Sequence, residues 1–219
     1  MYKILLFLLS LFFATGLLAK DQTKLLIKSI KNNDIVSFRT VVAKIDDANI
    51  LEDTGKSPIL LATEVNNPEM VSLLLDKGAD PNILDSRRNN AYLLAGANGN
   101  LEILKLLFEK SKIKIDIEAT NRYGGTALIP ACEKGYSNVV KYLISKGINI
   151  NHVNNLGLTC LLEVVTFGDD SSKYQEIVKA LLKNNADIEI KDQNGKTALQ
   201  ISHERGFNNI ANILQASNK

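Results

Sequence analysis

The chain has 219 residues, 45% of them apolar and 23% charged, a composition that excludes a disordered or collagen-like protein and leaves one folded domain as the default. Its 26 basic and 24 acidic side chains nearly cancel, and no block of Lys or Arg concentrates positive charge, so nucleic acid is not an expected partner. Two cysteines are too few for a scaffold held together by disulfides.

Residues 1–19 have the pattern of a secretory signal peptide. Lys3 precedes an apolar run from Ile4 to Leu18, and polar residues follow Ala19. The pattern predicts cleavage after Ala19 and export to the periplasm or the exterior, with no membrane attachment of the mature chain. The alternative is an uncleaved anchor, although a segment that crosses a bilayer needs about 20 apolar residues and this run is shorter.

After the signal, five helix-opening segments of similar sequence recur, beginning at Ser57, Asn90, Thr126, Thr159 and Thr197. The interval is 33 residues from the first to the second segment and from the third to the fourth, and 36 and 38 residues at the other two junctions. A second apolar stripe with helical spacing follows each segment. This period predicts repeating pairs of short helices, with one degenerate N-terminal unit before the first segment.

Polar, glycine-containing turns such as residues 192–196 separate the helix pairs and have the chemistry of hairpin-like loops. One pair cannot bury its apolar faces alone, so we expect the units to stack along one axis with polar units as caps at both ends. The sequence thus predicts an all-α repeat solenoid over residues 20–219. Its units are expected at about 21–53, 54–85, 86–120, 121–154, 155–192 and 193–219.

These repeats resemble the ankyrin repeat, whose signature is a Thr-Pro-Leu-His-x-Ala helix opening and a Gly-Ala-Asp ending. Residues 57–62 and 78–82 match it most closely, and the likeness extends over about residues 21–215. It implies helix-turn-helix units joined by β-hairpin-like loops. The signature His is replaced throughout, and at the four apolar replacements we expect packing to take the place of a hydrogen bond. The replacements are Leu60, Leu93, Ile129, Leu162 and Gln200.

No catalytic or cofactor-binding motif is complete. Residues 195–197 lack the earlier glycine of a phosphate loop, because Ile190 occupies its place, and residues 203–204 lack the second His of a zinc protease, because Phe207 occupies its place. His152 has no second His nearby to share a metal. We therefore predict a protein that is not an enzyme and binds no metal or cofactor.

Two features of the units at about 121–154 and 155–192 lead to structural expectations. Cys132 and Cys160 take core positions on different units, where helix axes lie about 8 to 10 Å apart, so we expect their Cα atoms to be too distant for a disulfide, with a pair as the alternative. The unit at about 155–192 also has five extra residues, and its second apolar stripe resumes at Ile177. Residues 168–173 are therefore predicted to form a projecting loop between its two helices.

The resemblance implies a monomeric module that binds a partner protein through a concave face made of hairpin tips and first helices. Two alternatives remain open: an accessory that protects a periplasmic haem enzyme such as catalase or supplies its haem, and a secreted effector. The units at about 121–154 and 155–192 have apolar or aromatic side chains beside an arginine, a composition typical of interface hot spots. The alternative is that Leu156 and Leu158 pack on neighbouring hairpins. The candidate residues are Arg87, Asn98, Arg122, Tyr123, Glu133, Lys134, Leu156, Leu158, Thr166 and Phe167.

Overall fold

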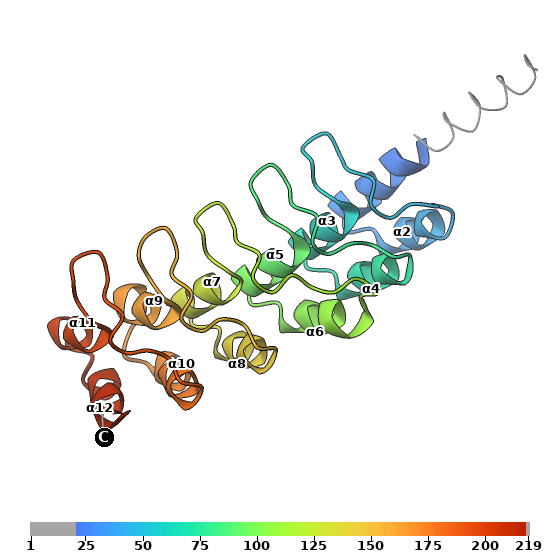
Figure 1. Ribbon diagram of the computed structural model, residues 1–219. Helices are drawn as coiled ribbons and strands as arrows, with labels where there is room; N and C mark the ends of the chain where they lie inside the picture. The colour runs from blue at the N-terminus through green and yellow to red at the C-terminus, as the bar shows by residue number, and fades with distance from the viewer. Residues whose placement is uncertain (1–20, 218–219) are drawn as a thin grey trace, which may run out of the picture.

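The structure is a computed structural model that describes residues 21–217; the predicted signal peptide lies outside the described residues. Helix pairs stack along one axis, with the first helices in one row, the second helices in another, and hairpin-like loops projecting from the row of first helices (Figure 1). The described part contains no extended strand, and an isolated antiparallel bridge joins Lys191 to Thr197 in the last loop. The prediction of an all-α repeat solenoid is confirmed.

We number the units from the one that opens at Ser57. The first helices of units one to five are α3 (Pro58–Glu64), α5 (Ala91–Ala97), α7 (Leu128–Glu133), α9 (Cys160–Phe167) and α11 (Ala198–Glu204). The second helices are α4 (Pro68–Asp76), α6 (Leu101–Lys110), α8 (Ser137–Ser145), α10 (Ser172–Lys183) and α12 (Asn208–Ser217). An N-terminal unit precedes them, formed by helical residues 21–31 and α2 (Ile35–Val42).

Small side chains let the first helices approach one another. Ala62, Ala95 and Ala131 are completely buried, as are Val164 and Ser202 at the same position of the last two units. A Cβ atom added at Gly96 of α5 would lie 2.7 Å from the Cβ of Ala127, so these two units are in direct backbone contact. The apolar stripes of both helix rows join in one continuous core.

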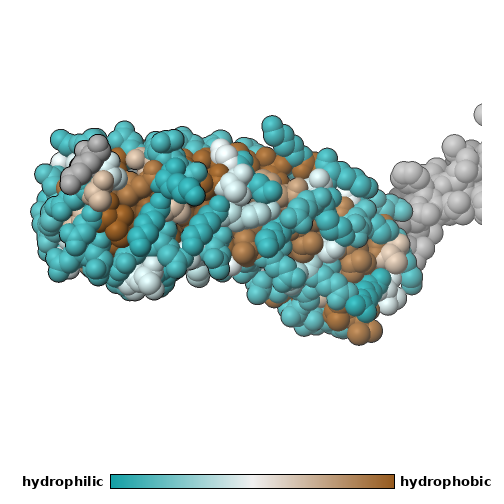
Figure 2. Space-filling model, turned by 90° about the horizontal axis from the view of Figure 1, so that it is seen from below, coloured by the Kyte–Doolittle hydropathy of each residue, from teal (hydrophilic) through white to brown (hydrophobic). Residues whose placement is uncertain are grey.

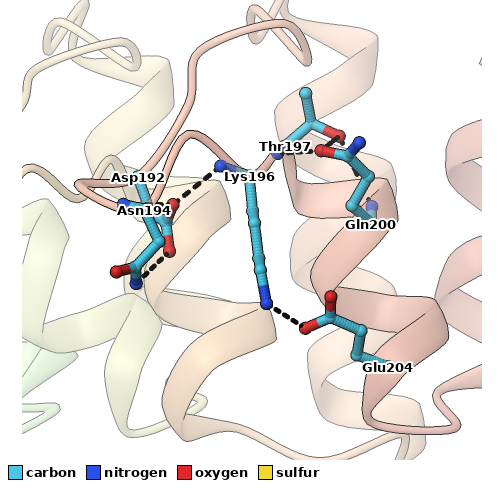
Figure 3. Close-up of polar contacts among 6 residues, drawn as sticks. All are labelled: Asp192, Asn194, Lys196, Thr197, Gln200 and Glu204. Carbon is cyan, nitrogen blue, oxygen red and sulfur yellow. Dashed lines mark hydrogen bonds and ion pairs between the residues drawn. The ribbon is translucent and has the colours of Figure 1, made fainter.

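Packing does replace a hydrogen bond where the signature His is missing, because four of the replacing side chains are buried and apolar. They are Leu60, Leu93, Ile129 and Leu162. The fifth replacement, Gln200, is exposed and forms a capping box with Thr197 (Figure 3). The side-chain oxygen of Gln200 accepts from the backbone N–H of Thr197 at 2.9 Å, and the backbone N–H of Gln200 donates to the Thr197 hydroxyl.

A side chain caps the first helix of units one, two, four and five. The caps are Ser57, Asn90, Thr159 and Thr197, each accepting from the backbone N–H three residues later. In the third unit Pro130 has no N–H to give to the carbonyl of Thr126, so Ile129 N–H donates to that carbonyl instead, at 3.3 Å. The Thr126 hydroxyl is left buried without a hydrogen-bond partner.

Cys132 and Cys160 form a disulfide across units three and four, with Cα atoms 5.5 Å apart. The expectation that they lie too far apart was wrong. The usual distance between helix axes does not apply here, because the small side chains in the row of first helices allow α7 and α9 to pack closely. Both cysteines are completely buried.

The five extra residues of unit four are only partly a loop. The segment 168–171 is not helical, but Ser172 and Lys173 begin α10, which has 12 residues where α4 and α8 have 9. Nor does the loop project freely, because the Asp170 carboxylate accepts from the backbone N–H groups of Asn209 and Ile210 at 2.9 and 3.0 Å. A carboxylate is stabilised there by the unpaired N–H groups at the start of α12.

The uncapped third unit gives a test by matched substitutions. Thr126 and Thr159 are both buried and both lose a methyl group on replacement by alanine, but only Thr159 caps a helix. We expect Thr159→Ala to lower the free energy of unfolding by about 1 kcal/mol more than Thr126→Ala does. Urea denaturation followed by circular dichroism measures both; equal losses would mean that the cap of α9 contributes nothing.

The disulfide closes a loop with a sequence separation of 28 residues. Cross-linking a loop of this size in the unfolded chain stabilises a folded protein by about 3–4 kcal/mol. We expect a phosphine reductant to move the urea midpoint of the wild-type protein downward by a corresponding amount, and to leave the midpoint of a Cys132→Ala/Cys160→Ala variant unchanged. Equal wild-type midpoints with and without reductant would contradict a stabilising disulfide.

Candidate partner-binding face

The loops between units are five hairpins of the same size, residues 52–56, 85–89, 121–125, 154–158 and 192–196. In each, the backbone N–H of the first residue donates to the carbonyl of the last, at 2.8 to 3.0 Å. This shared closure presents the three residues at each tip in the same way. The tips of all five hairpins therefore occupy equivalent positions along the row in Figure 1.

One side-chain oxygen holds each of the last four hairpins in shape. The Oδ1 atom of Asp192 accepts from the backbone N–H groups of Asn194 and Lys196, at 2.9 and 2.8 Å (Figure 3). Asp85, Asn121 and Asn154 make the same two bonds in their hairpins. The loops are thus fixed from within, as is common for Asp and Asn in turns.

Further hydrogen bonds join neighbouring units. The carbonyl of Tyr123 accepts from the backbone N–H of Asn155 at 3.0 Å, which ties the third hairpin to the fourth, and a ring nitrogen of His152 lies 2.6 Å from the carbonyl of Gly124. At the other end of the loops, a side-chain oxygen of one unit accepts a backbone N–H from the next: Asn49 from Asp80, Asn82 from Asp116, Glu118 from Asn149 and Asn151 from Asp187. The hairpins and first helices thereby form one continuous face, the one that the resemblance predicts to be concave.

Three large apolar side chains of the third and fourth units are half exposed on this face. Tyr123 and Leu156, on adjoining hairpins, are 55% and 53% exposed, and Phe167 at the end of α9 is 54% exposed. Leu158 is only 6% exposed and belongs to the core, so its expected place on the surface was wrong. It is the last residue of its hairpin, where the chain turns back toward the first helix, whereas Leu156 is at the tip.

The other candidate residues fall into two groups. Arg87, Asn98, Arg122, Glu133 and Lys134 are exposed, whereas Thr166 is half buried and its hydroxyl has no hydrogen-bond partner. The Arg122 guanidinium lies 4.6 Å from the centre of the Tyr123 ring and donates to its hydroxyl, which holds the ring in place.

Basic residues near the ends of the first helices are partly engaged within the protein. The Lys134 ammonium donates to the carbonyl of Ala97 at 2.7 Å, at the end of α5. Arg205, which sequence reasoning did not single out, does the same for the end of α9 by donating to the carbonyls of Val165 and Thr166. A cation is stabilised at a helix C-terminus, so these two side chains stabilise the contact between neighbouring units.

Glu163 of α9 is a buried acid that sequence reasoning missed. It is 3% exposed, and its Oε1 atom accepts from the Asn154 amide at 2.7 Å. Burial, together with the nearby charge of Glu133, raises the pKa of Glu163 to about 7, against the opposing effect of the Asn154 hydrogen bond. A signal was present: Glu163 occupies the repeat position that is apolar in the other units, as Leu61, Leu94, Pro130 and Ile201.

The described residues contain neither a metal-binding cluster nor a helix that could cross a membrane. Between residues 21 and 217, no three His, Cys, Asp or Glu side chains lie close enough together to hold a metal ion. None of the helices in the same range has the length and apolarity required to cross a bilayer. Figure 2 views the molecule from below, away from the hairpin tips, and shows hydrophilic residues covering most of that surface with hydrophobic ones between them.

Stacked helix pairs joined by projecting hairpins define the class of repeat proteins that bind through one extended face. A model of three ankyrin repeats matches residues 78–154, and the single ankyrin repeat model matches residues 54–86 and 156–193. The chain is 37% identical over 188 residues to the ankyrin repeat protein YahD of Escherichia coli, an alignment that covers 85% of this chain and 92% of that protein. The chain belongs to the ankyrin repeat family, whose repeats form protein-protein interaction modules.

Solved structures agree with this assignment. An ankyrin repeat domain from Acinetobacter baumannii is similar with a TM-score of 0.83 and 39% identity, over 88% of this chain and 97% of that one. The structure of the endopeptidase Bd0816 of Bdellovibrio bacteriovorus in complex with the immunity protein Bd3460 contains a chain that is similar with a TM-score of 0.73 and 25% identity, over 88% of this chain and 97% of that one.

The raised pKa of Glu163 makes stability depend on pH. The folded protein holds this proton up to about pH 7, whereas an unfolded Glu loses it near pH 4.5. The stabilisation of the folded state by this proton is therefore complete below pH 4.5 and is lost as the pH rises to 7. Glu163→Gln keeps the bond from Asn154 and cannot ionise. We expect the free energy of unfolding of this variant to exceed that of wild type by roughly 3 kcal/mol at pH 8. At about pH 4.5 we expect no such difference.

Urea denaturation at several pH values between 4.5 and 8 measures this difference. Glu109→Gln is the matched control, because Glu109 is exposed on α6 and its charge is not among the causes of the raised pKa of Glu163. A constant difference between Glu163→Gln and wild type over the whole range would mean that Glu163 is ionised in the folded protein throughout.

Proposed function

We propose that this protein binds a partner protein through its concave face, centred on units three and four. The observation that carries the proposal is the exposure of Tyr123, Leu156 and Phe167 on hairpins and a first helix that are otherwise held rigidly by internal hydrogen bonds. Solvated tips do not require large apolar side chains, and the equivalent tip positions of the outer units are polar.

The free energies support a binding role for these side chains. Burying one large apolar or aromatic side chain contributes about 1.5–3 kcal/mol, and half of each of these three is still exposed in the free protein. The Tyr123 ring is already oriented by Arg122, and the two hairpins are joined by a backbone hydrogen bond. Little conformational entropy is then lost on binding, so more of the burial energy becomes affinity.

The proposed place of action is an exported compartment, the periplasm or the exterior. The apolar run before Ala19 supports export, and the disulfide between Cys132 and Cys160 is compatible with an oxidising environment. The similarity to a chain in the complex of an endopeptidase with an immunity protein supports a protein partner.

The test uses the mature chain to capture a partner from periplasmic and culture-medium extracts, followed by titration of that partner against variants. We expect Tyr123→Ala and Phe167→Ala each to weaken the dissociation constant by about 30-fold, the effect of losing roughly 2 kcal/mol at a hot spot. Val36→Ala is the matched control, because Val36 is 72% exposed and lies on α2, outside the concave face.

The proposal fails if Tyr123→Ala and Phe167→Ala remain folded and bind the partner as wild type does. It fails equally if Val36→Ala weakens binding as much as they do, because the loss would then not be specific to units three and four. Circular dichroism melting curves of all three variants establish that each is folded.

A further inference from the structure

Three arginine side chains lie at the tips of neighbouring hairpins. Arg87 and Arg88 are at the tip of the second hairpin and Arg122 is at the tip of the third, and all three are exposed. Among residues 21–217, none of these guanidinium groups forms an ion pair with a carboxylate. The carboxylate of Asp85 in the same hairpin is buried and accepts from the backbone N–H groups of Arg87 and Asn89.

The outer hairpins show that this excess of positive charge is specific to the second and third. Lys56, the last residue of the first hairpin, pairs with Glu64 at 2.7 Å. Lys196, the last residue of the fifth, pairs with Glu204 at 2.6 Å (Figure 3), so both hairpin lysines are neutralised within their own units. The equivalent positions are Asn89 and Ala97 in the second unit and Gly125 and Glu133 in the third. Neither unit can form that internal pair, and their arginines remain available to a partner.

Arg88 also occupies a backbone position that suits glycine. It has a φ of 60°, and the same position in the other four hairpins is Gly55, Gly124, Gly157 and Gly195, with φ between 71° and 79°. A side chain in this left-handed region costs about 1 kcal/mol or more relative to glycine. Residues held in such a conformation at a binding surface point to a role that offsets the cost.

Aromatic and apolar surface adjoins these arginines on their C-terminal side. Arg122 stacks on Tyr123, whose hairpin contacts that of Leu156. Toward the N-terminus, Arg87 lines a hollow whose other lining residues, from the first two hairpins and neighbouring helices, are mostly polar or charged. Along the row, the positive groups of the second and third tips are therefore followed by the exposed side chains of Tyr123 and Leu156.

We propose that this row of tips recognises an acidic segment of the partner protein, in which carboxylates bind Arg87, Arg88 and Arg122 and a neighbouring apolar side chain packs on Tyr123 and Leu156. The inference rests on the proposed function and names the chemistry of the partner. The planar guanidinium matches a carboxylate with two parallel hydrogen bonds.

The test begins with a library of short random peptides displayed on phage and selected on the wild-type protein. We expect the selected peptides to be enriched in Asp or Glu next to a large apolar residue. The most enriched peptide is then synthesised with a fluorophore, and its dissociation constant is measured by anisotropy at low and high salt. We expect affinity to fall as salt rises, because the carboxylate contacts are exposed.

The variant Arg87→Gln/Arg88→Gln/Arg122→Gln is expected to bind this peptide about tenfold or more weakly. The matched control Lys105→Gln/Lys112→Gln/Lys183→Gln removes the same charge from exposed positions away from the hairpins and is expected to bind as wild type does. Arg88→Gly alone is expected to weaken binding and to raise the melting temperature by about 2–4 °C, since it relieves the left-handed backbone.

Several results would overturn the inference: selected peptides without acidic residues, unchanged binding by the triple arginine variant, an equal loss in the lysine control, or tighter binding of a single-stranded oligonucleotide than of the acidic peptide. The proposed function is tested separately by Tyr123→Ala. Neutral apolar peptides that bind wild type but not Tyr123→Ala would leave the binding face in place and reject only its acidic specificity. If Tyr123→Ala and Phe167→Ala both bind the peptides with wild-type affinity, the proposed binding face itself is rejected.

Discussion

Everything in this structure depends on close contact between the first helices of neighbouring units. A single pair of short helices buries too little apolar surface to be stable, so each unit is stabilised by the next. Completely buried small residues such as Ala62, Ala95 and Ala131 permit that approach, and the absent Cβ of Gly96 permits it most closely. The same closeness brings Cys132 within bonding distance of Cys160. A larger side chain at any of these positions would separate two units and tilt every hairpin beyond them.

The hairpins divide their residues between structure and recognition. The first residue of each of the last four hairpins uses one oxygen to hold two backbone N–H groups, which leaves it unavailable to a partner. The side chains at the tips do not hold the loop in shape, and their chemistry differs from one hairpin to the next. They include arginines in the second hairpin, Arg122 and Tyr123 in the third, and Leu156 in the fourth. Because the loops have the same shape, differences in side chain become differences in what each position can bind.

Departures from the repeat pattern gather at the junction of units three and four. Pro130 removes the cap of α7, Glu163 places an ionisable group in a position that is apolar elsewhere, and the Cys132–Cys160 disulfide crosses the same junction. The covalent link stabilises the place where the cap is lost and an acid is buried. Proteins tend to break their own local rules where they function, and Tyr123, Leu156 and Phe167 belong to these two units.

The period of the sequence and its apolar spacing were enough to identify the repeats and the fold class, because the inward face of a short helix is set by local periodicity. The resemblance to the ankyrin repeat placed Tyr123, Leu156 and Phe167 on the surface, and their side chains are half exposed. Distances between units were beyond the reach of the sequence, since these depend on how side chains of separate helices fit together. For this reason only the tertiary structure decided that the cysteines pair, that Leu158 is buried while Leu156 is exposed, that Asp170 binds the start of α12, and that burial raises the pKa of Glu163.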